Sequence, residues 1–259
     1  MTLASNITTS GAQIYNGTVA LGGSITLDAG ASSVTFNDNV GHVGITYANY
    51  VSQHTSNNIY NLAVLANTIN INADITTYGT QTYGSSSSPA NVVIGGNGTN
   101  GTVRTLISED PAITFYGTIN DSVAKTHDLM LRSVAYTSNQ TPTVSINGDV
   151  GLIKPLKTLT VATGLQETLG SPRFADISTS QYLGSISLVG NVTTLGNQEY
   201  TSNQITIGAN TQASSYEFTS TEGRVIFNTG SGSNTSPTLA TGSSYTISDT
   251  YTTSLSRLS

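Results

Sequence analysis

The chain has 259 residues and a formal net charge of −6, and 8% of its residues are charged, against roughly 25% in an average soluble domain. Its length allows one large all-β unit or two ordinary domains. The negative charge argues against nucleic acid as a partner, because nucleic-acid binders carry basic stripes. It also supplies no polybasic patch for an anionic membrane, and no apolar run is long enough to span one, so we expect no direct membrane insertion.

The first 46 residues show clean two-residue alternation. Short alternating runs at 18–21, 24–27 and 33–36 are separated by Gly, Asp and Asn residues. These runs predict strands joined by turns, whereas the 3.6-residue periodicity of helices is nearly absent from the chain.

One thirteen-residue phrase occurs three times, at 3–15, 71–83 and 188–200. Each copy has Asn or Asp at its fourth position, Ile or Val at its fifth, and then Thr-Thr-x-Gly-x-Gln-x-Tyr. An aliphatic-Gly step follows each copy, and later an alternating piece at 34–37, 113–116 and 225–228. The chain is therefore interpreted as a tandem array.

The distances between copies are uneven, and we expect them to be near multiples of a structural repeat of about 20–25 residues. Parallel stacking lets like side chains bond their copies about 4.8 Å away. We therefore expect an all-β fold, a parallel β-helix (β-solenoid). Residues 1–228 would form the solenoid, with inserted loops around 47–61 and 104–180, and residues 229–259 a Ser/Thr-rich linker and terminal strand.

The first loop is rich in side chains that could contact a partner. Tyr47, Tyr50, His54 and Tyr60 lie there among amides, and exposed Tyr can stack on a sugar ring or on a protein. The alternative is that these tyrosines flank the core.

Charge is concentrated in the middle of the chain. No Lys or Arg precedes residue 104, yet six occur between 104 and 173, namely Arg104, Lys125, Arg132, Lys154, Lys157 and Arg173. Insertions in repeat proteins usually map to one flank, where binding sits. The alternative is that these charges only keep an insertion soluble.

The tail holds a last alternating segment with Tyr245, Ile247 and Tyr251. This segment could pack on its own solenoid or add to the edge of a neighbouring copy as a donated strand.

Recognisable catalytic and metal motifs are few. The three His residues share no local motif, and no Gly-x-Ser-x-Gly occurs. Asp28 with Asp38 could hold Ca²⁺ if they lay on adjacent turns, although solvated turn residues are the simpler and favoured interpretation. The pair Glu109 and Asp110 is the other acidic candidate. We expect no catalytic residue, cofactor or metal.

The segment from Asn6 to Gly17, followed by Val19, Leu21-Gly22 and 25–27, resembles the repeats of large bacterial surface proteins related to filamentous haemagglutinin. The resemblance covers the first 46 residues best and 104–180 hardly at all, and the Asn-Pro-Asn-Gly type of secretion motif is missing. It implies a right-handed parallel β-helix, export by two-partner or autotransporter-like routes, and adhesion or biofilm formation.

The sequence thus leaves three functional hypotheses. The first is a non-enzymatic shaft of a secreted bacterial surface protein, which contacts surface glycans or proteins. The second is a filament or sheath subunit that binds other copies of itself. The third is a β-helical carbohydrate-active enzyme with its cleft in the middle stretch.

Overall fold

The computed structural model describes residues 1–41, 60–96, 102–109, 112–135, 140–165, 183–209, 214–229 and 236–249. These residues form 23 β-strands and no helix. Each strand-to-strand pairing among them is parallel, so this part of the chain contains no antiparallel hairpin. The prediction of an all-β fold with stacked parallel strands is confirmed.

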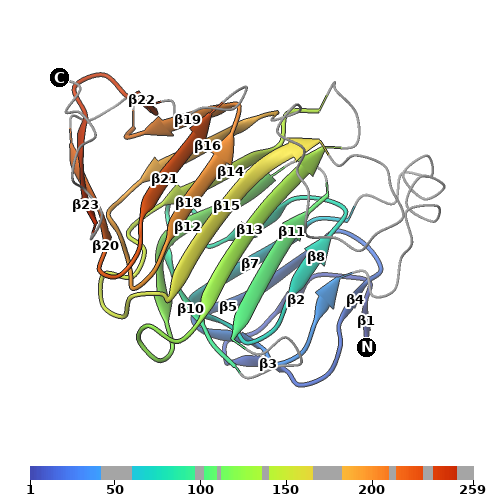
Figure 1. Cartoon of the computed structure of the whole chain (residues 1–259). Helices are drawn as coiled ribbons and strands as arrows, with labels where there is room; N and C mark the ends of the chain where they lie inside the picture. The colour runs from blue at the N-terminus through green and yellow to red at the C-terminus, as the bar shows by residue number, and fades with distance from the viewer. Residues whose placement is uncertain are drawn as a thin grey trace.

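The strands fall into three rows, and in each row the neighbours follow one another along the chain. Row one contains β1 (Thr2–Leu3), β4 (Ala20–Leu21), β6 (Val40–Gly41), β8 (Ile75–Thr77), β11 (Val103–Ser108), β13 (Asp128–Ala135), β15 (Thr158–Leu165), β18 (Gln198–Ser202) and β21 (Val225–Thr229). In Figure 1 the strands of this row lie side by side across the front, with the colour changing from blue to red in order.

Rows two and three share three long strands, each of which bends from one row into the next. Row two contains β2 (Ile7–Thr8), the first halves of β5 (Ile25–Phe36), β7 (Leu62–Ile71) and β12 (Ala112–Asp121), and β9 (Gln81–Tyr83), β14 (Thr143–Asn147), β16 (Ser185–Val189), β19 (Gln204–Ile207) and β22 (Thr238–Leu239). Row three contains β3 (Gln13–Tyr15), the second halves of β5, β7 and β12, β10 (Ala90–Ile94), a single bridge at Val150, β17 (Val192–Thr194), β20 (Ser215–Ser220) and β23 (Ser244–Asp249).

The chain therefore visits rows one, two and three in the same order nine times. One such visit is called a circuit below. The middle stretch, where inserted loops were expected, supplies β11 to β15 to the same rows within its described part. The tail supplies β22 and β23 to the last circuit.

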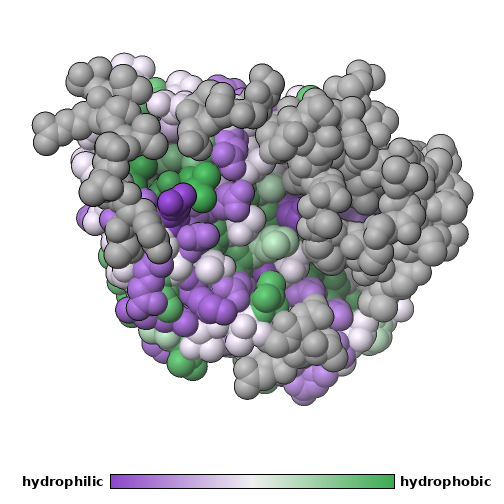
Figure 2. Space-filling view, in the orientation of Figure 1, coloured by the Kyte–Doolittle hydropathy of each residue, from purple (hydrophilic) through white to green (hydrophobic). Residues whose placement is uncertain are grey.

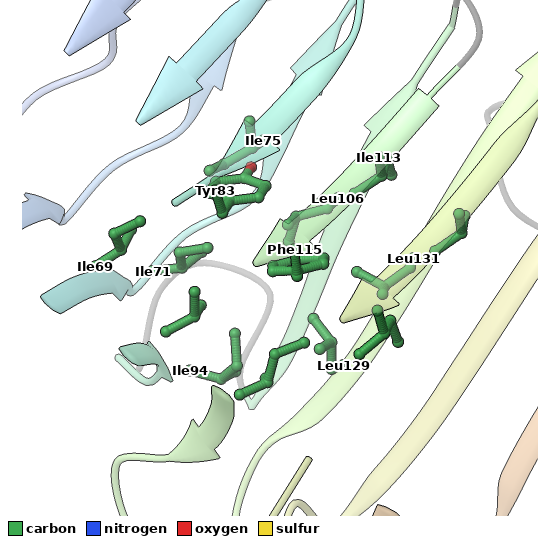
Figure 3. Packing of buried hydrophobic residues seen from close by; sticks show 14 of the residues in the cluster. Ile69, Ile71, Ile75, Tyr83, Ile94, Leu106, Ile113, Phe115, Leu129 and Leu131 are labelled. Atoms are coloured by element: carbon green, nitrogen blue, oxygen red, sulfur yellow. The ribbon is translucent and has the colours of Figure 1, made fainter. Parts of the chain in front are cut away.

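The core is built from the inward residues of successive circuits. One column in row two runs through Leu27, Val64, Tyr83, Phe115, Ile146, Leu188 and Ile207, all at most 1% exposed. Figure 3 shows Tyr83 and Phe115 pointing into the same interior as Leu106 and Leu131 of row one. Burying each such side chain contributes about 1.5–3 kcal/mol, so the alternating pattern read from the sequence is the main stabilising feature.

Like side chains also form ladders between circuits, as the sequence predicted. Asn72 donates its amide to Asn37, and Asn37 donates to Asn16, at 2.7 and 2.8 Å. A buried column of hydroxyls in row one runs through Thr77, Ser108, Ser133, Thr163 and Ser202. Thr163 and Ser202 hydrogen-bond to each other at 2.7 Å. Thr77 and Ser108 both donate to the Gly79 carbonyl, whereas Oγ of Ser133 has no hydrogen-bond partner among the described residues.

Candidate functional surfaces

The repeated phrase forms a turn between two rows, with a buried glutamine at its centre. In the second copy, the Nε2 atom of Gln81 donates to the Ile107 carbonyl of the next circuit at 2.7 Å and to the Thr77 hydroxyl at 3.2 Å. The Tyr83 hydroxyl donates to Oε1 of Gln81 at 2.9 Å. Gln81 is fully buried although it occupies a core column between Leu62 and Ile113, so its amide groups are satisfied entirely by protein atoms.

The other two copies repeat this hydrogen bonding. Gln13 donates to the Asp28 carbonyl at 2.9 Å, and Gln198 donates to the Thr219 carbonyl at 2.8 Å. In both copies the Tyr hydroxyl again donates to the Gln Oε1 atom, at 2.8 and 3.2 Å. Burial raises the pKa of the phenol in all three copies, at Tyr15, Tyr83 and Tyr200. These tyrosines therefore stay neutral donors at ordinary pH.

The remaining fixed positions of the phrase have their own hydrogen bonds. The second Thr donates to the carbonyl of the phrase Gly at 2.6 Å in every copy, from Thr9, Thr77 and Thr194. The Asn or Asp at the fourth position accepts a backbone N–H from the next circuit, at 2.8 Å for Asn6, 2.9 Å for Asp74 and 2.8 Å for Asn191. Each copy thus closes its own turn and also ties it to the following circuit.

The tyrosine of each phrase stacks on the phenylalanine of the alternating piece that follows it in sequence. The ring centroids are 5.5 Å apart for Tyr15 and Phe36, 4.8 Å for Tyr83 and Phe115, and 5.0 Å for Tyr200 and Phe227. Each pair occupies matching register positions in adjacent strands. The two recurring sequence features are therefore neighbours in space, one circuit apart.

The three copies do not stack on one another, which corrects the expectation that they are spaced by near multiples of one structural repeat. The first copy turns from row two to row three (β2 to β3), the second from row one to row two (β8 to β9), and the third from row three to row one (β17 to β18). Each copy uses a different corner of the circuit. The distances between copies are consequently not whole numbers of circuits.

The outward side of row two carries a regular strip of hydroxyl groups. Its members lie in register through successive circuits at Thr26, Thr82, Thr114, Ser145, Ser187, Thr206 and Thr238, with Ala63 as the exception. Figure 2 shows the side on which row one faces the viewer, and there too hydrophilic and hydrophobic residues are interspersed. Short hydroxyl side chains hydrate this surface where charged residues are scarce.

A buried polar cluster lies in the middle of the stack, and sequence reasoning did not identify it. His127 places Nδ1 2.6 Å from Oδ1 of Asp121 and Nε2 3.0 Å from the Gly96 carbonyl. A carbonyl only accepts, so Nε2 is the donor in its contact with Gly96. Arg104 donates to the carbonyls of Gly95 and Gly96, and burial lowers its pKa while Asp74 opposes that shift.

This cluster anchors loops and does not resemble an exposed reaction centre. Arg104, Asp121 and His127 are at most 3% exposed, and protein atoms occupy both ring nitrogens of His127. The Asp121 carboxylate accepts the backbone N–H groups of Val123, Thr126 and His127. Asp121 and His127 flank one loop, whereas Arg104 lies at the start of β11, so no local pattern in the sequence links the three residues.

The predicted contact residues are only partly described. Tyr47, Tyr50 and His54 lie outside the described residues, whereas Tyr60 is half-buried and packs against the core. In the predicted assembly strand, Tyr245 pairs with Tyr216 inside the chain's own stack and its ring contacts Phe218 and Phe227. Ile247 also packs on the core, and Tyr251 lies outside the described residues. The contact hypotheses for both groups stay predictions.

The acidic pairs act as backbone caps where they are described. Asp28 accepts the N–H of Gly30, and Asp38 accepts the Thr18 hydroxyl and the N–H of Asn39. Asp28 and Asp38 lie in the same circuit and not in adjacent ones. Asp110 is outside the described residues. Among the described residues no three His, Cys, Asp or Glu side chains group as metal ligands.

No helix in the described part of the chain is long and apolar enough to cross a membrane. Comparisons with models of protein families, with curated proteins and with solved structures find no match for this chain.

Proposed function

We propose that this chain is a segment of a right-handed parallel β-solenoid that serves as a non-enzymatic shaft of a secreted bacterial surface protein, for attachment or biofilm formation. The observation that carries the proposal is the nine-fold repetition of the same row order with parallel, in-register pairing. A continuous stack of this kind is a regular scaffold that extends along one axis. A scaffold does not need a reaction centre.

The corner turns support a mechanical role. Each phrase closes a corner through three kinds of hydrogen bond. The buried Gln amide donates to a carbonyl, the second Thr donates to the phrase Gly carbonyl, and the Asn or Asp accepts an N–H of the next circuit. Buried, fully satisfied polar networks rigidify a core. Nine circuits spaced about 4.8 Å apart give a stack on the order of 40 Å tall.

The absence of Cys from the sequence permits a direct test of the stacking. A Thr82→Cys/Thr114→Cys variant joins adjacent positions of the hydroxyl strip, so it should form a disulfide, which needs Cα atoms about 4.4–6.8 Å apart. The matched Thr82→Cys/Ser145→Cys pair is two circuits apart and should stay reduced. Equal oxidation of both pairs would refute the stacked architecture.

A second experiment tests the shaft role itself. Beads coated with the purified chain should adhere to bacterial or host cells while releasing no soluble sugar from surface polysaccharides. Adhesion lost on adding competing glycan would identify the partner class. Release of sugar products would instead establish the carbohydrate-active alternative and overturn the non-enzymatic proposal.

The open strand edges favour a self-assembling filament as the second candidate. Within the described residues, β1, β2 and β3 at one end and β21, β22 and β23 at the other each lack a strand partner on one side. Unpaired edges are templates for another strand. Fibres that lengthen with protein concentration in electron micrographs would support this candidate, and a concentration-independent monomer would reject it.

A further inference from the structure

Two neighbouring turns from row three to row one bring together all three lysines of the chain. These turns, residues 121–127 and 149–157, are called the lysine loops. They lead into β13 and β15 and lie side by side at the lower left of Figure 1. The N–H of Lys125 donates to the Pro155 carbonyl at 2.6 Å, and Nζ of Lys154 donates to the Ser122 carbonyl at 2.8 Å. Lys125 is thus distant in sequence from Lys154 and Lys157 but shares one surface with them.

The same loops expose three aliphatic side chains. Val123 is 62% exposed, Leu152 60% and Ile153 76%. They are three of the seven large apolar side chains that are exposed in the described part of the chain. Three such residues gathered on two adjacent loops indicate a binding surface, since singly scattered ones need no explanation.

The loop backbone is held firmly. The Oδ1 atom of Asn120 accepts the N–H groups of Ile153 at 3.1 Å and Lys154 at 3.3 Å. The Asp121 carboxylate holds the amide of Val123 at 3.1 Å in the other loop. The aliphatic side chains therefore project from a fixed platform, and little ordering entropy remains to be lost on binding.

The carboxylates of this region are turned toward the protein. Asp121 contacts His127, Asp149 accepts the N–H of Asn191, and Asp128 contacts Lys157 at 3.4 Å. Outward charge therefore comes mainly from the exposed ammonium groups of Lys125 and Lys154, whereas Lys157 pairs with Asp128. Because charges are screened beyond about 8 Å at physiological ionic strength, this local positive charge matters more at contact than the net charge of the chain.

We propose that the lysine loops bind the surface of an anionic lipid bilayer, with the aliphatic tips in the headgroup layer and the lysines at the level of the phosphates. A protein partner is the poorer match, because protein interfaces are enriched in aromatic residues and Arg and depleted in Lys. The lysine loops contain no aromatic residue and no Arg. A bilayer also accepts protruding tips without a preformed pocket, to a depth of about 5–10 Å. The proposal does not depend on the shaft role.

Vesicle sedimentation with the full chain tests this proposal. The probe is a vesicle of 30% phosphatidylglycerol in phosphatidylcholine, compared with pure phosphatidylcholine and repeated in 0.5 M salt. Binding should occur to the anionic vesicles and fall in high salt. A Leu152→Ser/Ile153→Ser variant should lower the partition coefficient about tenfold or more, and Lys125→Asn/Lys154→Gln about fivefold for each lysine removed.

The charge variants are chosen to fold normally. Lys125 has a φ of 65°, a conformation that Asn tolerates well, and Gln at position 154 keeps an N–H donor for the Ser122 carbonyl. Ile14→Ser is the matched control, because Ile14 is also 60% exposed but lies in the first circuit, and it should bind as the wild type does.

Three results would overturn the proposal. They are no association with anionic vesicles, equal association for the control and the loop variants, and a dimer of the wild-type chain that the Leu152→Ser/Ile153→Ser variant dissociates. The last result would make the loops a contact between copies of the chain.

Discussion

Replacing Gln81 by Leu distinguishes two physical accounts of the repeated phrase. Gln81 shares a core column with Leu62 and Ile113, so hydrophobic burial alone predicts that Leu stabilises the fold. The hydrogen bonds predict the opposite, because the buried Tyr83 hydroxyl would lose its acceptor. A buried polar group left without a partner costs about 1–3 kcal/mol.

The net effect follows from the bonds that would be lost. Leu at position 81 also removes the donors to Ile107 and Thr77, although the Thr77 hydroxyl keeps its bond to Gly79. Lost hydrogen bonds contribute about 1 kcal/mol each, and the added apolar burial offsets about 1–2 kcal/mol. We expect Gln81→Leu to lower the free energy of unfolding by about 2 kcal/mol, or the melting temperature by about 4–8 °C.

A double-mutant cycle measured by urea unfolding tests this reasoning. The Gln81→Leu/Tyr83→Phe variant removes both partners, so it should cost less than the sum of the single changes by about 1–2 kcal/mol. Gln204→Leu is the control, since Gln204 is exposed in row two, and it should change stability by less than about 0.5 kcal/mol. A Gln81→Leu variant more stable than the wild type would refute the claim that the hydrogen bonds of Gln81 stabilise the fold.

Three further predictions follow from buried or strained groups. Burial raises the pKa of Tyr200, so the stabilisation that comes from its neutral phenol is present below about pH 10. This stabilisation is lost as pH rises further, at about 1.4 kcal/mol per pH unit. Urea unfolding at pH 8–11.5 should therefore show a smaller loss of stability for Tyr200→Phe than for the wild type. Gly41→Ala should lower the free energy of unfolding by about 2–4 kcal/mol, because φ is +111° and the added Cβ would lie 1.5 Å from a carbonyl oxygen of the next circuit. Gly11→Ala is the control, because a Cβ at Gly11 meets open space, and calorimetry should show little change for it. Asp121→Asn should speed amide hydrogen exchange at 123, 126 and 127 by tenfold or more, through loss of a charged acceptor that also holds His127; unchanged exchange would show that the carboxylate does not hold the loop.

Local patterns in the sequence predicted the strands and the repeated phrase but not the arrangement of rows. The alternation at 25–27 and 33–36 predicts which side chains face inward. In the structure the two runs are the two halves of β5. That β5 bends from row two into row three depends on contacts with β7 and β3. Such contacts join residues far apart in the chain, and no local periodicity carries them.

Long-range placement also explains what was missed in the middle stretch. The charges there suggested inserted loops that bind a partner, and β11 to β15 continue the three rows through the described part of the stretch. Arg104 and His127 converge on the Gly96 carbonyl only because their circuits are adjacent. Stacking likewise gathers Lys125 and Lys154 on one surface. Sequence spacing alone gives no sign of either grouping.

The use of one phrase at three different corners explains why its copies recur at uneven distances. The bonds from Thr to Gly and from Tyr to Gln stay inside the phrase, while the Gln amide and the Asx cap need only a backbone carbonyl and an N–H from the next circuit. Every corner of a parallel stack offers those two groups, because they belong to the backbone of the following strand. The phrase is therefore a self-contained corner unit that can close any of the three turns. Its recurrence marks where a tight corner is needed and not the length of a repeat.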